Sequence, residues 1–208
     1  MTGAHADLLA RVAGYYSGKF AAHGATAAGV DWNSPESQAL RFAELSQLFE
    51  PGPFSVIDYG CGYGAFADFL SAHALLNAYQ GFDVAADMIA DARRRHAAAP
   101  ACRFVTDSAA LEAADYTIAS GIFNVRFDIS DDDWLAYMVS TLDQMMALST
   151  RGFAFNALTS YSDADRRRAD LYYADPRVFF DHCKRRFSKR VSLLHDYALY
   201  EFTMLVRL

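Results

Sequence analysis

Three glycines at alternate positions, Gly60, Gly62 and Gly64, place the strongest constraint on how this chain can fold. A short apolar run precedes them and a segment compatible with a helix follows, so residues 54–66 are predicted to form a strand, a tight turn and the start of a helix. Glycine has no Cβ atom, so the turn can adopt positive φ and a ligand can lie directly against the backbone. This pattern indicates a cofactor that contains adenosine.

The residue Asp58, two positions before the first glycine, narrows the choice of cofactor. The pattern of Gly60, Gly62 and Ala65 also satisfies the dinucleotide fingerprint, so the glycines alone do not separate nicotinamide from other adenosine cofactors. A pyrophosphate at the helix N-terminus would lie about one turn from the carboxylate of Asp58, at a cost in Coulomb energy. A ligand that carries an ammonium and a sulfonium would instead be attracted.

These residues resemble the first motif of class I S-adenosylmethionine (SAM)-dependent methyltransferases, which reads acidic-x-Gly-x-Gly-x-Gly. Asp58 and the three glycines match it position for position. Later segments also resemble motifs of that family, in the family's order: residues 81–83, 102–108 and 116–124. Together the matches cover roughly residues 54–156. The resemblance implies that the cofactor is S-adenosyl-L-methionine and that the chain is a methyltransferase.

The resemblance also implies roles for individual residues. Asp83 corresponds to the acid that accepts hydrogen bonds from both ribose hydroxyls, Met88 to an apolar residue against the adenine, and Asp107 to the acid that recognises the adenine amino group. For Asp107 the alternative is an ordinary solvated loop acid, and for Tyr16 and Trp32 it is helix packing. The expected cofactor contacts are Tyr16, Trp32, Asp58, Gly60, Cys61, Gly62, Gly64, Asp83, Val84, Met88, Asp107, Ser108, Ser120 and Gly121.

The acceptor is expected at the carboxyl edge of the sheet, where open α/β sheets bind their ligands. The loops that follow residues 115–119 and 153–156 lead to this edge. His195 is a candidate general base, for which a hydrogen-bonded structural histidine is the alternative, and Asn124 is a candidate for orienting the acceptor. The candidate substrate contacts are Phe123, Arg126, Asn156, Tyr161 and Tyr172.

The expected reaction is methyl transfer to an oxygen or nitrogen of a small-molecule acceptor. A sulfonium is already an activated methyl donor, so alignment contributes most and a base is needed only for a protonated acceptor. Residues 120–126 lack the Asn/Asp-Pro-Pro-aromatic pattern of nucleic-acid amino methyltransferases in this family, and the net charge of −6 disfavours nucleic acid. Arg126 and the basic run 184–186 would suit an anionic acceptor.

Three other functions stay open. An RNA or protein methyltransferase would have a continuous basic groove. A NAD-dependent oxidoreductase would need a second mononucleotide-binding half or a substrate domain, for which 208 residues leave no room. A non-catalytic SAM-binding subunit would keep the glycines and lack an acceptor pocket.

The element order predicts an α/β fold: a doubly wound seven-stranded sheet, mostly parallel with a C-terminal antiparallel hairpin, and helices on both faces. The last two strands must be antiparallel because only residues 196–199 join them. Helices are expected over residues 5–20 and 35–50 and from about residues 64, 85, 131 and 176, and strands over residues 54–58, 78–83, 103–106, 115–119, 153–156, 190–195 and 200–208.

Residues 1–53 are expected to form an N-terminal helical lid, and residues 54–208 the SAM-binding core of what is overall one domain. The three cysteines are odd in number and have no metal-ligand spacing, so neither a disulfide framework nor a metal site is expected. No apolar segment approaches the length of a membrane span. We therefore expect a soluble cytoplasmic protein.

Overall fold

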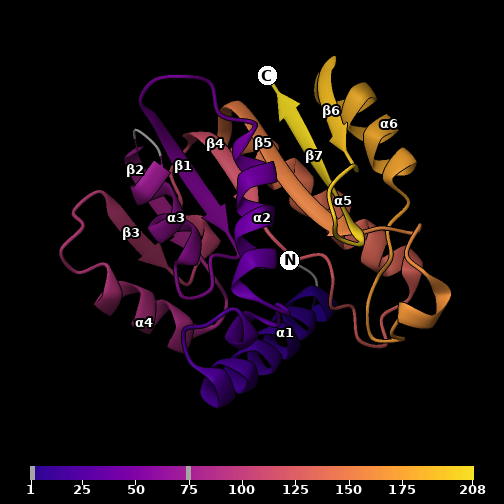
Figure 1. The fold of residues 1–208 in the computed structure, drawn as a ribbon, viewed down its shortest axis with the longest axis horizontal. Helices are drawn as coiled ribbons and strands as arrows, with labels where there is room; N and C mark the ends of the chain where they lie inside the picture. Colours follow the sequence, from indigo (N-terminus) through magenta and orange to yellow (C-terminus); the bar gives the residue numbers. More distant parts are fainter. Residues whose placement is uncertain (1–2, 74–75) are drawn as a thin grey trace. The chain divides into compact units, whose positions relative to one another are not determined.

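The computed structural model describes residues 3–73 and 76–208, which form strands alternating with helices after two N-terminal helices (Figure 1). The helices are α1 (Gly3–His23), α2 (Pro35–Ser46), α3 (Ala65–His73), α4 (Ala86–Arg95), α5 (Asp131–Ala147) and α6 (Pro176–Arg186). The strands are β1 (Phe54–Tyr59), β2 (Leu76–Phe82), β3 (Cys102–Val105), β4 (Ala114–Ala119), β5 (Ser149–Leu158), β6 (Arg190–Leu194) and β7 (Glu201–Arg207). Short 3-10 turns are η1 (Ala28–Val30), η2 (Ser108–Ala110) and η3 (Ala164–Arg166).

The strands belong to one seven-stranded sheet in the order β3-β2-β1-β4-β5-β7-β6. Strands β1, β2 and β3 pair in parallel, as do β4 and β5, whereas β7 runs antiparallel to β5 and β6. This confirms the predicted mostly parallel sheet with a C-terminal antiparallel hairpin. The chain divides into two compact units, one of residues up to 42 and 51–112, the other of residues 43–50 and 113–208.

In the first unit, the parallel register of β1 and β2 brings the motif residues together. Asp58 lies opposite Gly81, and Tyr59 lies opposite Phe82. The chain then turns, and the N–H groups of Gly60 and Cys61 both donate to the Phe82 carbonyl, at 2.7 and 2.9 Å. These backbone bonds fix the glycine turn to the end of β2.

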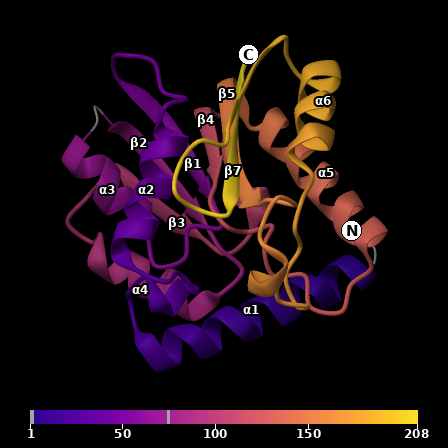
Figure 2. The same ribbon diagram turned by 45° about the vertical axis from the view of Figure 1, so that its right-hand side comes forward.

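The first unit also contains α1, which lies beside α4 in both ribbon views (Figures 1 and 2). A hydrogen bond of 2.7 Å from the Ser17 hydroxyl to Asp87 Oδ1 joins the two helices. The N-terminal segment is thereby attached to the helix that follows β2.

In the second unit, α5 begins where its capping residue predicts. The Ser130 hydroxyl accepts the Asp133 N–H at 3.2 Å, and three aspartates occupy the positive end of the helix dipole. The stripe of apolar side chains predicted to be buried is buried, namely Trp134, Met138, Leu142 and Met145.

Two element boundaries differ from the expectation by four residues, and several others differ by one to three. Helix α2 ends at Ser46 rather than near Glu50, because the next three N–H groups bond to carbonyls three residues back and tighten the chain before Pro51. Strand β5 begins at Ser149 rather than near Phe153, because its backbone pairs with β4 from Ser149 onward and with β7 from Gly152 onward.

No helix within residues 3–73 and 76–208 combines the length and apolar character that crossing a bilayer requires.

The pairing of β5 with β7 leaves no room for a side chain at Gly152. A Cβ atom there would lie 2.5 Å from the Val206 carbonyl oxygen and 3.2 Å from Leu48 Cδ1. We expect Gly152→Ala to lower the free energy of unfolding by about 1–3 kcal/mol, measured by urea denaturation. Gly14→Ala is the matched control, because a Cβ in this part of α1 meets nothing within 4 Å. That variant should be neutral or more stable by up to about 1 kcal/mol.

Candidate cofactor site and candidate acceptor site

The glycine turn of the first unit has the backbone conformation that its sequence predicts. The φ angles of Gly60, Gly62 and Gly64 are +88°, +55° and +87°, in the left-handed region that side chains disfavour. A Cβ atom on Gly62 would lie 3.0 Å from Val30 Cγ1 and 3.7 Å from Met88 Sδ. Gly62 is buried, so a side chain at this position would strain both the backbone and the packing around the turn.

Asp83, at the end of β2, holds this turn in place. Its Oδ2 accepts the Gly62 N–H at 2.8 Å, and its Oδ1 accepts the Ala85 N–H at 2.9 Å. Burial raises the pKa of Asp83, and the two N–H donors counteract that rise. Each carboxylate oxygen keeps a second lone pair, so Asp83 can accept further hydrogen bonds from a ligand.

Asp58 is buried, and its carboxylate accepts a hydrogen bond of 2.5 Å from the Tyr79 hydroxyl. Burial raises the pKa of Asp58 to about 7, the Tyr79 hydrogen bond lowers it, and the charge of Asp83 raises it. A carboxyl group in this state is close to balance between its acid and its carboxylate at neutral pH. Sequence reasoning found Asp58 but missed Tyr79, because the pair depends on the register of β1 and β2.

The other predicted cofactor contacts of this unit lie on the turn and along the ends of β2 and β3. The buried Cys61 thiol lies 3.6 Å from the Gly62 carbonyl oxygen, Met88 is buried, and Val84 is half-buried. Asp107 is exposed and caps η2 by accepting the Ala109 N–H at 2.9 Å, and Ser108 is half-buried. These contacts describe the local structure around each residue. The contact of each residue with the cofactor stays a prediction.

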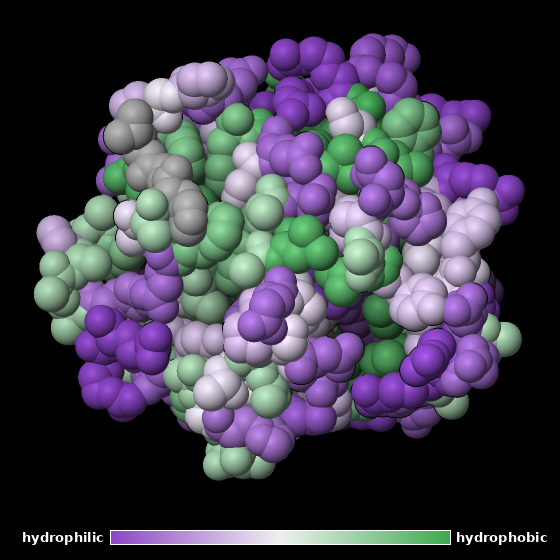
Figure 3. Space-filling model, viewed as in Figure 1, coloured by the Kyte–Doolittle hydropathy of each residue, from purple (hydrophilic) through white to green (hydrophobic). Residues whose placement is uncertain are grey.

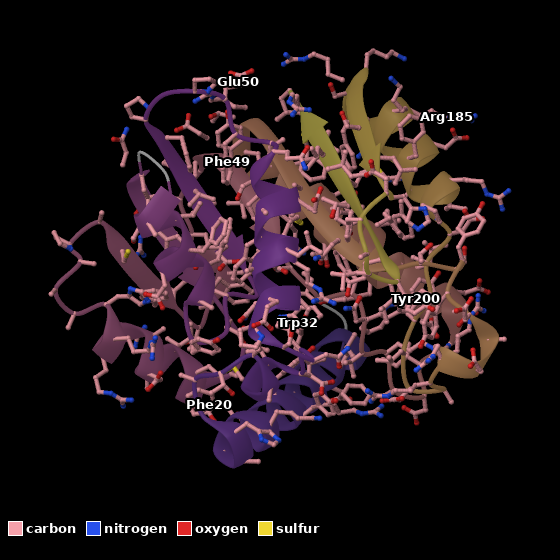
Figure 4. All side chains as sticks on the ribbon, in the orientation of Figure 1. Phe20, Trp32, Phe49, Glu50, Arg185 and Tyr200 are labelled. Atoms are coloured by element: carbon pink, nitrogen blue, oxygen red, sulfur yellow. The ribbon has the colours of Figure 1, made fainter. Side chains whose placement is uncertain are left out.

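The N-terminal segment reaches the glycine turn through Val30 and is fixed by polar contacts that the sequence did not reveal. Asp31, with φ of +61°, accepts hydrogen bonds from the Tyr15 hydroxyl at 2.7 Å and from Lys19 Nζ at 2.6 Å. The guanidinium of the buried Arg41 lies 3.8 Å from the centroid of Trp32, which Figure 4 labels.

Tyr16, a predicted cofactor contact on α1, is half-buried, and its ring packs edge-on against the Tyr15 ring with centroids 5.2 Å apart.

In the second unit, two asparagines predicted as polar groups of the acceptor site bind the backbone. Asn156 Oδ1 accepts the Gly121 N–H at 2.7 Å, and its Nδ2 lies 3.5 Å from the Ser120 hydroxyl. Asn124 Oδ1 accepts the Leu158 N–H at 3.2 Å. Both amides therefore join the loop after β4 to β5.

Arg126 and Phe123 occupy contrasting positions in that loop. Arg126 donates from Nη1 to the Ile129 carbonyl and to Asp131, while its buried Nε has no hydrogen-bond partner among the described residues. Phe123 is completely buried, and the Trp134 indole N–H donates to its carbonyl oxygen at 3.1 Å. The Arg126 side chain is therefore partly exposed in this loop, and the Phe123 side chain is part of the core.

Tyr172 is half-buried, and its N–H donates to the Asn124 carbonyl at 2.8 Å. This bond joins the segment before α6 to the loop after β4.

Tyr161 and His195 lie together at the carboxyl ends of β5 and β6, with ring centroids 5.6 Å apart. Both side chains are exposed, Tyr161 to 60%. Because β5 and β6 each run antiparallel to β7, they are parallel to one another and end on the same edge. The second unit therefore presents an aromatic ring and an imidazole together at that edge.

The basic run at the end of α6 is occupied by surface contacts. Arg185 pairs with Asp181 and Arg186 with Asp143, at 3.2 and 3.4 Å, and Lys184 donates to the Lys189 carbonyl. Figure 4 labels Arg185, and Figure 3 shows hydrophilic and hydrophobic residues side by side on this part of the surface. These pairings fit a solvated helix end.

Comparison with known proteins establishes the class. Residues 56–145 match the profile of a family described as a methyltransferase domain. The chain is also 53% identical over 155 residues to Rv1506c, a Mycobacterium tuberculosis protein classed by name as a methyltransferase, and the match covers 74% of this chain and 93% of that protein. The chain belongs to this methyltransferase family, and its methyl donor is S-adenosylmethionine.

Solved structures show the same fold. The DhpI–SAH complex is 16% identical with a TM-score of 0.65, covering 95% of this chain and 96% of that one. Magnesium protoporphyrin IX methyltransferase from Synechocystis with bound SAH is 15% identical with a TM-score of 0.57, covering 83% and 80%. At these identities the likeness establishes the fold.

The glycine turn generates a test of the cofactor site. Gly62→Val should abolish binding of S-adenosylhomocysteine, because a β-branched side chain would need left-handed φ and would press against Val30 Cγ1, which would displace the turn. Isothermal titration calorimetry measures the affinity, and circular dichroism reports the fold. Gly18→Ala is the control, because a Cβ at Gly18 meets nothing within 4 Å. Global unfolding of Gly62→Val would show that the glycine serves the fold first.

Proposed function

We propose that this methyltransferase transfers the methyl group of SAM to an oxygen or nitrogen of a small-molecule acceptor. The observation that carries the proposal is the exposed pair of Tyr161 and His195 at the carboxyl edge of β5 and β6. A flat aromatic surface beside an imidazole suits an organic acceptor that loses a proton when it is methylated. The net charge of −6 and the ion-paired arginines of α6 favour such an acceptor over RNA.

For the cofactor, we propose that the turn from Gly60 to Gly64 lies against SAM, that Asp83 binds the ribose hydroxyls and that Asp58 faces the ammonium group. The left-handed glycines and the free lone pairs of Asp83 support this assignment. Bound SAM supplies a methyl group already activated by its sulfonium. The chain itself then has to orient the acceptor and receive its proton.

For the N-terminal segment, we propose that residues 1–53 act as a lid over the cofactor turn, carrying Tyr16 and Trp32. The approach of Val30 to Gly62 and the link from Ser17 to Asp87 support a segment held against this part of the first unit.

Asp83 gives a direct test of the cofactor proposal. Asp83→Ala should weaken S-adenosylhomocysteine binding by about 3–6 kcal/mol, because two charge-assisted hydrogen bonds of roughly 1.5–3 kcal/mol each are lost. Titration calorimetry on the purified protein measures this loss. Asp68→Ala, which removes a half-exposed carboxylate of α3 in the same unit, should bind as the wild type does. Wild-type affinity in Asp83→Ala would remove Asp83 from the site.

The acceptor proposal is tested by methyl transfer from radiolabelled SAM to a panel of small phenols, amines and carboxylates, with total RNA and protein as competing acceptors. We expect label in the small-molecule fraction. Label in RNA or protein would instead support a macromolecular substrate, and binding of SAM without transfer to any acceptor would support a non-catalytic subunit.

With an acceptor identified, His195→Ala should lower kcat by about 10²-fold or more with little change in cofactor affinity. His23→Ala, which removes an exposed imidazole at the end of α1, is the control. Full turnover by His195→Ala would assign His195 a structural role and leave catalysis to alignment.

A further inference from the structure

The hydrogen bond between Tyr79 and Asp58 lies beneath the glycine turn and is enclosed by the first unit. Both side chains are buried, Tyr79 completely. From this geometry we infer that Tyr79 is a positioning residue, which holds Asp58 ready for the cofactor ammonium and couples cofactor binding to loss of a proton from Asp58. The inference rests on the proposed role of Asp58 as the residue that faces the ammonium.

Strand register explains why Tyr79 reaches this carboxylate. Tyr79 lies opposite Val56, and Asp58 lies opposite Gly81 two residues further along. The Tyr79 ring packs against Phe104 with centroids 5.6 Å apart, so neighbours on β3 restrict its orientation. The hydroxyl oxygen is 2.5 Å from Asp58 Oδ2, which fixes the direction of the carboxyl group.

The charges around the pair are all acidic. Asp83 at the end of β2 acts on Asp58, and the thiols of Cys61 in the turn and Cys102 on β3 act on Tyr79. No ion pair joins Asp58 to a lysine, arginine or histidine among the described residues. The carboxylate of Asp58 therefore lacks a protein cation, and a cationic ligand would provide the missing counter-charge.

The proton balance follows from these surroundings. Burial and the nearby Asp58 raise the pKa of Tyr79 well above its ordinary value, so its hydroxyl keeps its proton and donates. Burial raises the pKa of Asp58 to about 7, so near neutral pH part of the protein carries a protonated Asp58. When an ammonium binds beside that group, the carboxylate form is selected and the proton passes to the solvent. Cofactor affinity should therefore rise with pH up to the pKa of Asp58.

The Tyr79 hydroxyl stabilises the carboxylate form, so its removal should raise the pKa of Asp58 further. Tyr79→Phe should therefore shift the midpoint of the affinity–pH profile upward. S-adenosylhomocysteine should then bind about tenfold more weakly at pH 6 and about fivefold more weakly at pH 7, with the difference closing at higher pH.

The experiment measures S-adenosylhomocysteine binding by calorimetry from pH 6 to pH 8.5, in phosphate and in Tris to obtain the protons released. Tyr116→Phe is the matched control, because it removes a hydroxyl from a buried tyrosine of β4, in the second unit, that accepts the Glu50 N–H at 3.2 Å. We expect the control to keep the wild-type profile and Asp58→Asn to bind weakly without pH dependence.

If Tyr79→Phe keeps the wild-type profile and Asp58→Asn binds weakly, the inference about Tyr79 is overturned and the proposed role of Asp58 is upheld. Wild-type affinity in Asp58→Asn would instead overturn the proposed role itself. Should Tyr79→Phe fail to fold, the wild type decides: release of a substantial fraction of a proton near pH 6.5 supports the proton coupling, and no release refutes it.

Discussion

The hydrogen bond from the Gly62 N–H to Asp83 is the contact on which the cofactor site depends. It joins the middle of the glycine turn to the end of β2, and the parallel pairing of β1 with β2 determines that the two ends meet. The same carboxylate also accepts the Ala85 N–H just before α4. The Asp83 carboxylate thus fixes both the turn after β1 and the residues just before α4. This single side chain orders the backbone of the site without a ligand.

Two acids of this unit show how position decides behaviour. Asp83 receives two backbone N–H donors, which counteract the effect of burial on its pKa. Asp58 receives a single tyrosine hydroxyl and is more completely enclosed, so its pKa rises to about 7. Both residues are aspartates at the ends of neighbouring strands. The number of donors around each carboxylate therefore changes how strongly burial raises its pKa.

Much of the fold could be predicted because its signals are local. The glycine spacing, the capping serine Ser130 and the four-residue link between the last strands each depend on near neighbours in the chain, and the predicted strands and helices are present. Partners across the sheet could not be predicted, because they depend on register. Tyr79 is one example. Asn156 is another, since its bond to the Gly121 N–H joins residues 35 positions apart in the chain, and its contact with the acceptor stays a prediction.

The hydrogen bonds of Asn124 and Asn156 to the backbone have a consequence for how the acceptor preference of such an enzyme can change. Asn124 and Asn156 fix the loop after β4 by bonds to backbone groups, and a backbone group is present whatever side chains the loop carries. Neighbouring positions, such as the exposed Tyr161, can therefore be exchanged without loss of these bonds. In a scaffold of this kind, a mutation that alters which acceptor binds need not alter how the chain folds. New acceptor preferences then become accessible by single mutations.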